Sequence, residues 1–327
     1  MINESFSIRL REARQMMGLS MDKLVERTNG AITKQSISRY EKGIMRPKRD
    51  ALQAIAKALN ISEAYFDGTN LKIDVPMLRT TSNGNVSEDE LQALEAKLSF
   101  WAEQYLAKEK KAGFPTQFKN PIKGTKVSTQ EDAIQASSLL REKWHCGDGP
   151  IASILRLLER KGIMILAANL PEYVFGMSTW ADKKHPLMIL DFNPEKSSVE
   201  KLRFTAVHEL AHLLLLFPED SPLRLEERCD LFASFFLLPK LALIEELGSK
   251  KREKITLEEM IDIKELYGAS LAASIIAARD YGIITTEYKR AWYAEHIEPN
   301  PREIGNGHYA FPETLGREKR VNSIVDS

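Results

Sequence analysis

The run FTAVHELAHLLLLF at residues 204–217 places two imidazoles and a carboxylate in an otherwise apolar segment. On a helix, His208 and His212 are four residues apart and project from one face. Neutral imidazoles at the edge of a core need a partner for their nitrogen lone pairs, and a zinc ion binds imidazole nitrogens well. Glu209 can hold the water of such a metal and act as general base. The HExxH spacing therefore predicts one Zn²⁺ per chain.

A catalytic zinc site needs a third protein ligand and an open fourth position. The candidate lies in the segment RLEERCDLFASFFLLP, which begins 12 residues after His212. On a helix Glu226 and Asp230 share a face, whereas Glu227 points about 100° away. We expect Glu226 to bind the metal and Asp230 to orient a ligand histidine. Cys229 is better explained as a small buried residue.

Two alternatives to a catalytic site stay open. The histidines could be bonded to carbonyl groups within a core helix, or the zinc could be structural, with no part in chemistry.

Charge is divided unevenly along the chain. The first 66 residues carry 12 Lys and Arg against 7 Asp and Glu, and the remainder carries 34 against 39. A basic module joined to a mildly acidic body indicates a polyanionic partner for the first part alone.

Residues 7–66 are predicted to form five short helices in a compact bundle. Caps are expected at Ser20, Thr33, Asp50 and Ser62, and Ile8 is expected among the buried residues. Gly30 can take the positive φ of a sharp helix-to-helix corner. If the helix after this corner enters a major groove, its first turn and outward face would meet DNA. The candidate DNA-binding residues are Thr33, Lys34, Gln35, Ser36 and Arg39, and those expected along phosphates are Lys42, Arg46, Lys48 and Arg49.

This module resembles the XRE (phage repressor and Cro-like) helix-turn-helix family in three segments: LREARQMMGLSMDKLVERT, TKQSISRYEKGIMRP and LQAIAKALNIS. The resemblance implies binding to a double-stranded DNA operator. The alternative is a small helical interaction domain with a solvated basic face.

The middle of the chain is predicted to join two units. The turn-rich TTSNGN stretch at residues 80–85 indicates a flexible linker. Ser87 and Glu90 form a capping box for an amphipathic helix that ends near Gly113, which we interpret as a packing or dimer-forming helix. A symmetric homodimer would suit a palindromic operator.

The second half is predicted to mix helices with a small three-stranded sheet. Ser128 and Pro150 are expected to open helices, and the strands are expected in GIMILAA, YVFGMSTW and PLMILDF. An exposed PLMILDF strand could align a peptide by edge pairing. Further helices turn a corner at Gly268, and the chain from Glu298 onward is expected to be loosely ordered.

The motifs FTAVHELAHLLL and ExxCDxFAxxxLLP, preceded by GMSTW and PLMILDFN, resemble the ImmA/IrrE family of bacterial and phage metallopeptidases. The resemblance runs from about Pro150 to Tyr281. It implies a one-zinc peptidase that cleaves helix-turn-helix repressors, with His208, His212 and Glu226 as ligands and Glu209 as base. Many members carry another histidine just after the HExxH helix, where this chain has Leu216 and Phe217.

These patterns together predict a multidomain protein, mainly α with a small β-sheet. We expect an all-α helix-turn-helix bundle at residues 1–67, a linker and amphipathic helix at 68–127, an α+β HExxH metallopeptidase-like domain at 128–248, and a helical region with a tail at 249–327.

The leading hypothesis is a transcription regulator in which a DNA-binding head is tethered to a zinc-dependent endopeptidase acting on a repressor-type protein or on its own chain. The competing hypothesis is a DNA-binding repressor or antitoxin whose zinc domain senses a signal without cutting. No leader is apparent and the longest apolar runs fall well short of the roughly 20 residues that span a bilayer, so we expect a cytoplasmic protein without membrane contact. Cys146 and Cys229 are expected to be reduced.

Overall fold

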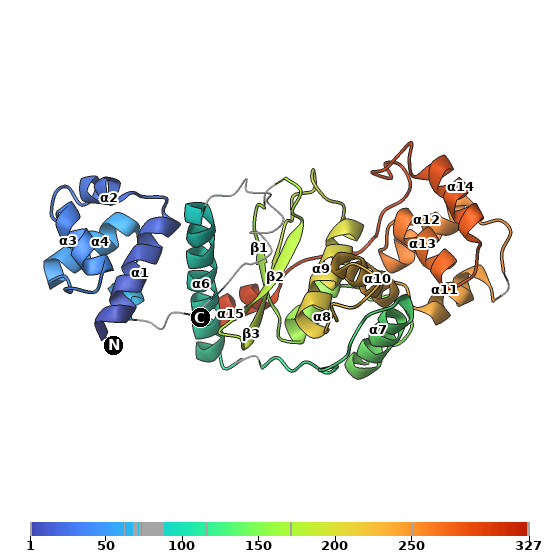
Figure 1. Ribbon diagram of the computed structural model, residues 1–327, viewed down its shortest axis with the longest axis horizontal. Helices are drawn as coiled ribbons and strands as arrows, with labels where there is room; N and C mark the ends of the chain where they lie inside the picture. The colour runs from blue at the N-terminus through green and yellow to red at the C-terminus, as the bar shows by residue number, and fades with distance from the viewer. Residues whose placement is uncertain are drawn as a thin grey trace. The chain divides into compact units, whose positions relative to one another are not determined.

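The computed structural model describes residues 2–61, 63–67, 71, 73, 88–114, 117–170, 172–249 and 251–325 (Figure 1). Contacts divide these residues into two compact units. The first comprises the described residues of 1–116, 179–185 and 321–327, and the second those of 117–178 and 186–320. The expected architecture, mainly helical with a small three-stranded sheet, is confirmed. Over the described residues, none of the helices combines the length and the apolar character that crossing a membrane requires.

The first unit contains a bundle of short helices whose ends follow local sequence signals. Its helices are α1 (Ile2–Met16), α2 (Met21–Arg27), α3 (Lys34–Glu41), α4 (Arg49–Leu59), the 3-10 helix η1 (Glu63–Asp67) and α6 (Glu88–Lys111). The side chains of Ser20 and Thr33 cap α2 and α3, as predicted. Gly30 has φ +75°, which the corner between those helices requires. Leu24, Ile37 and Ile55 are fully buried between the helices.

Two local predictions for this bundle are wrong. Ile8 is 43% exposed, and the buried face of α1 is formed by Phe6, Leu10 and Ala13. Asp50 does not cap α4, because the helix starts earlier, with Lys48 at the N-cap. Asp50 lies in the first turn, where its charge faces the positive end of the helix dipole.

Helix α6 packs against α1 of the same unit. Arg9 on α1 donates to the Tyr65 carbonyl oxygen at 2.6 Å and also pairs with Glu103 on α6. The other Glu103 oxygen accepts the backbone N–H of Leu71 at 3.0 Å. The amphipathic helix therefore has a packing role within this unit. The predictions for Ser62, the TTSNGN stretch, Ser87 and the side chain of Glu90 lie outside the described residues.

The remaining elements follow in the order helix, sheet, helix. They are α7 (Gln130–Trp144), α8 (Ile154–Arg160), β1 (Met164–Ala167), β2 (Gly176–Ala181), β3 (His185–Leu190), α9 (Val199–Leu214), α10 (Leu225–Leu237), α11 (Lys240–Leu247), α12 (Leu257–Tyr267), α13 (Leu271–Asp280), α14 (Thr286–His296) and α15 (Arg317–Val325). Helix α10 packs against both α7 and α9 (Figure 1). Gly268 turns the predicted corner between α12 and α13 with φ +63°.

The strand order is β1-β3-β2, with β1 parallel to β3 and Met164 opposite Leu187. Strand β3 is thus the central strand, and it is buried along nearly its whole length. The prediction that PLMILDF offers an exposed edge for a peptide is therefore wrong, because both of its edges are already paired.

Two helix caps differ from the predicted ones. Thr129, not Ser128, caps α7, since Thr129 and Asp132 form a reciprocal capping box. Helix α8 is capped by Ser153, so it starts later than Pro150 predicts.

The expectation of a loosely ordered C-terminal segment is wrong. Glu313 is buried, and its carboxylate accepts hydrogen bonds from the backbone N–H groups of Ile154 and Leu155 at the start of α8, at 2.8 and 3.0 Å. The same carboxylate lies 2.5 Å from the guanidinium of Arg203 on α9, and neither side chain is exposed. The segment is ordered because it supplies the counter-charge for a buried arginine.

We predict that Glu313→Ala lowers the free energy of unfolding by about 3–5 kcal/mol, because it leaves Arg203 charged, buried and without its carboxylate. Urea unfolding of the full chain would measure this change. The control Glu298→Ala removes an exposed carboxylate and should change stability by less than about 0.5 kcal/mol. Equal effects of the two substitutions would contradict the structural role of Glu313.

Candidate functional site

The candidate site is centred on α9, whose start is capped by the Ser198 side chain. Strand β2 passes very close to this helix. A Cβ atom at Gly176 would lie 2.6 Å from Cγ2 of Thr205 and 3.4 Å from Cγ of Glu209. A side chain at this position would have to displace the side chain of Thr205 or Leu190, so glycine allows the close approach of β2 to the face of α9 that carries Glu209.

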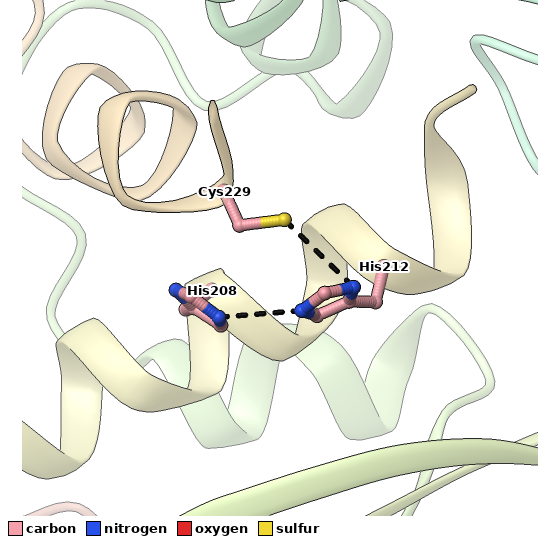
Figure 2. Close-up of side chains that lie close together, drawn as sticks. All are labelled: His208, His212 and Cys229. Atoms are coloured by element: carbon pink, nitrogen blue, oxygen red, sulfur yellow. Dashed lines mark hydrogen bonds between the residues drawn. The ribbon is translucent and has the colours of Figure 1, made fainter. Parts of the chain in front are cut away.

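Three acceptor atoms from α9 and α10 converge on one point. The Nε2 atoms of His208 and His212 are 3.3 Å apart, and Figure 2 shows the two rings projecting from the same helix with these atoms facing each other. Glu226 Oε2, from α10, lies 3.0 Å from His208 Nε2 and 3.7 Å from His212 Nε2. The three predicted ligands are therefore brought together.

The spacing of these atoms fits a zinc ion. With bonds of about 2.0–2.1 Å in a tetrahedron, two ligand atoms lie about 3.3 Å apart. The distance between the two nitrogens equals this value, and the two distances to Glu226 lie on either side of it. The side chain of Glu226 is 55% exposed, whereas both histidines are largely buried. The cluster thus borders solvent on the side of Glu226.

Asp230 occupies the position expected of an orienting residue. Its Oδ1 lies 2.8 Å from Nδ1 of His208, the ring nitrogen that faces away from His212 and Glu226. A hydrogen bond from Nδ1–H to this carboxylate leaves the Nε2 lone pair free for a metal.

A second ligand set, His208, His212 and Cys229, is also close enough to hold a cation. However, the Cys229 sulfur lies 3.8 Å from Nδ1 of His212, not from Nε2 (Figure 2). The thiol is fully buried, and burial raises its pKa well above the usual range. Cys229 therefore contacts the His212 ring at Nδ1, whereas Glu226 lies beside the Nε2 atoms of both histidines.

The electrostatics of the cluster show its affinity for positive charge. Burial by itself would lower the pKa of His208, but the carboxylates of Asp230 and Glu226 raise it to about 9. Hydrogen bonds from His208 and His212 hold the pKa of Glu226 well below its usual range. A proton on His208 occupies the place that a divalent cation would otherwise take.

Glu209 faces the sheet side of the cluster and is only 4% exposed. Burial raises its pKa, while His212 and His208 oppose that shift. Its Oε2 accepts a hydrogen bond of 2.8 Å from Ser178 on β2. Sequence reasoning missed Ser178, because its role arises only when β2 packs on α9; the GMSTW motif that contains it was the available signal.

Phe217 lies where the resembled family often has another histidine. Its ring packs edge-on against His212, with ring centroids 6.2 Å apart. The Phe217 side chain therefore supports the His212 ring sterically and supplies no metal-binding atom.

On α3 the five candidate DNA-binding residues have different surroundings. Thr33 Oγ1 accepts the N–H of Ser36 at 3.1 Å and lies 2.9 Å from the Ser36 hydroxyl, so these two side chains fix the start of the helix. Lys34 pairs with Asp22 of α2 at 2.7 Å. Gln35 and Arg39 are exposed, and at four residues apart they share one face.

One of the cations expected along phosphates is engaged within the protein. Arg46 lies 2.5 Å from Asp67 and stacks over the Phe6 ring at 5.4 Å. Lys42, Lys48 and Arg49 are exposed, so they remain the candidates for phosphate contact.

Comparison with known proteins gave one finding for this part of the chain. A helix-turn-helix family model (HTH_3) matches residues 10–66, which include α2, α3 and the corner between them. No curated protein and no solved structure matches the chain. Residues 10–66 are thus an XRE-type helix-turn-helix domain, which supports a DNA-binding transcription regulator.

Proposed function

We propose that this transcription regulator is also a zinc-dependent endopeptidase, whose substrate is a helix-turn-helix repressor or its own chain. The single observation that carries this proposal is the convergence of His208 Nε2, His212 Nε2 and Glu226 Oε2 next to the Glu209 carboxylate. The resemblance to the ImmA/IrrE family supports the choice of a protein substrate.

Each residue has a distinct part in the proposed reaction. His208, His212 and Glu226 would hold the zinc, and Asp230 would keep Nδ1 of His208 protonated. When bound, zinc lowers the pKa of a coordinated water and polarises a carbonyl oxygen. Because Glu209 Oε2 accepts the Ser178 hydrogen bond, Oε1 is the atom free to take a proton from the attacking water and pass it to the leaving amine.

A non-catalytic zinc sensor is the second candidate. It is favoured by the burial of Glu209 and by its hydrogen bond to Ser178, which would also suit a purely structural carboxyl group. The two functions predict the same metal site and differ in whether Glu209 is needed for cleavage.

The first prediction from the proposed function concerns the metal ligands. Glu226→Ala should abolish stoichiometric zinc binding, since it removes one of three ligands, and Asp230→Asn should weaken zinc affinity roughly 10–100-fold. Metal analysis and competition with a zinc-binding dye would measure both. Glu227→Ala is the matched control from the same helix and should retain zinc.

Cys229→Ala distinguishes the two possible ligand sets in the same assay. Zinc content should not change, because the thiol faces Nδ1 of His212. Loss of zinc in this variant together with retention in Glu226→Ala would replace the proposed ligand set with His208, His212 and Cys229.

The second prediction concerns cleavage. Glu209→Gln should leave zinc content and DNA binding intact and reduce proteolysis by about 100-fold or more, because general base catalysis contributes on that order. New protein N-termini would be compared by mass spectrometry between cells carrying the wild type and cells carrying the variant. Equal sets of cleavage products would favour the sensor.

The third prediction concerns DNA. We propose that Gln35 and Arg39 contact bases. Both are exposed, whereas the side chains of the other three candidates, Thr33, Lys34 and Ser36, form the contacts within the protein described above. Arg39→Ala should weaken binding to an operator selected from random DNA by about 1–3 kcal/mol and relax the preference at one base pair.

Fluorescence anisotropy would measure this loss. The control Lys57→Ala removes an equal charge from the exposed face of α4. If both variants bind alike, α3 does not contact the bases.

A further inference from the structure

A pocket of about 400 Å³ lies between the end of α7, the helix α8 and the loop that joins these two helices. This volume is in the usual range for sites that enclose a small ligand. The pocket is lined by none of the residues of the candidate metal centre. Its apolar walls are formed by Trp144, Pro150, Ile151 and Leu157.

The wall at the start of α8 is held in place by hydrogen bonds from other parts of the second unit. The carbonyl oxygen of Ile151 accepts a hydrogen bond from Nη2 of Arg203 at 2.8 Å. The hydroxyl of Ser153, another lining residue, donates to Glu313 at 2.7 Å. A wall that is already ordered loses little conformational entropy when a ligand binds. The pocket is therefore pre-organised.

The ionised side chains of the lining are cationic. They belong to Arg160 and Lys161 at the end of α8, and the lining contains neither aspartate nor glutamate. Nε of Arg160 donates to the carbonyl oxygen of Arg156 at 3.2 Å, and Nζ of Lys161 donates to that of Trp144 at 3.4 Å. Over the described parts of the chain, neither cation forms an ion pair with a carboxylate. The terminal nitrogens of Arg160 and two donors of Lys161 thus remain available to a ligand.

The carboxylate next to these cations in the sequence does not neutralise them. Glu159 is only 3% exposed, and its two oxygens accept the backbone N–H groups of Gly316 and Arg317, each at 3.0 Å. Its charge is therefore directed toward the C-terminal segment. The pocket keeps an excess of two formal positive charges, which favours an anionic occupant.

We infer that this pocket binds a small molecule in which an oxyanion, a carboxylate or a phosphate, is joined to an apolar body. Arg160 and Lys161 would donate charged hydrogen bonds to the oxyanion. The apolar body would cover Trp144, Ile151 and Leu157. A bare anion leaves these walls uncovered, and a neutral apolar molecule leaves both cations without a counter-charge. The inference goes beyond the proposed function and uses none of its residues.

The first test compares the two parts of such a ligand. Phenyl phosphate, phenylacetate, inorganic phosphate and benzyl alcohol would be titrated by calorimetry into the full chain. At least one of the two aromatic anions should bind about tenfold more tightly than inorganic phosphate and benzyl alcohol. Arg160→Gln and Lys161→Gln should each lower this affinity about tenfold, because each removes a charged donor. The control Lys143→Gln removes an exposed cation of α7 outside the lining and should not.

Cys146 provides a reporter inside the pocket for the second test. Its thiol belongs to the lining and is half-buried, whereas Cys229, the other cysteine of the chain, is fully buried. Labelling of Cys146 by N-ethylmaleimide would be followed by mass spectrometry. The tighter aromatic anion, at about ten times its Kd, should slow the labelling about tenfold, because only about a tenth of the pockets stay empty. Benzyl alcohol at the same concentration should have no such effect.

Three results would overturn the inference. The first is that neither aromatic anion binds more tightly than inorganic phosphate and benzyl alcohol. The second is tight binding without protection of Cys146, because the anion then binds elsewhere on the chain. The third is an undiminished affinity in both Arg160→Gln and Lys161→Gln. Arg160 is exposed, so Arg160→Gln should melt at the temperature of the wild type, and a loss of affinity in this variant reports on binding and not on folding.

Discussion

Three acceptor atoms that converge on one point are stabilised by a positive charge between them. The arrangement of α9 and α10 at the candidate site depends on this constraint. His208 and His212 contribute a nitrogen each from α9, and Glu226 contributes an oxygen from α10. A proton on His208 supplies the charge when no metal is bound, which is why its pKa rises to about 9. A divalent cation would supply it better, because it interacts with all three atoms at once. The zinc binding that we propose at this cluster would therefore be coupled to proton release.

The cluster also depends on residues far from it in sequence. Arg203 lies five residues before His208 on α9, and its guanidinium bonds to Glu313 and to the carbonyl oxygens of Tyr267 and Gly268. A buried guanidinium is costly unless each of its donors is bonded, so this network holds α9, α12 and the C-terminal segment in one arrangement. The same carboxylate of Glu313 completes the start of α8. The long C-terminal segment thus belongs to the scaffold of the site.

Local rules predicted the parts that depend on spacing within one helix. The i and i+4 positions of His208 and His212, and of Glu226 and Asp230, specify a shared face before any tertiary structure is known. The cap of α7 also follows a local rule, since Thr129 is followed three residues later by Asp132 and the two form a reciprocal capping box. Local rules failed where packing decides. The contact of Ser178 with Glu209 and the central position of β3 arise from strand pairing and from packing on α9, which one strand sequence does not specify.

The helix-turn-helix domain shows a related division between supporting and exposed side chains. Thr33 and Ser36 use their hydroxyls to fix the start of α3, and Lys34 is paired with Asp22. Side chains engaged in this way position the helix, whereas base recognition needs donors and acceptors that remain available to DNA. Gln35 and Arg39 meet that requirement on one face. Because the basic excess is confined to the first 66 residues, the salt dependence of DNA binding should come from this domain, while the acidic remainder of the chain attracts cations and repels the polyanion.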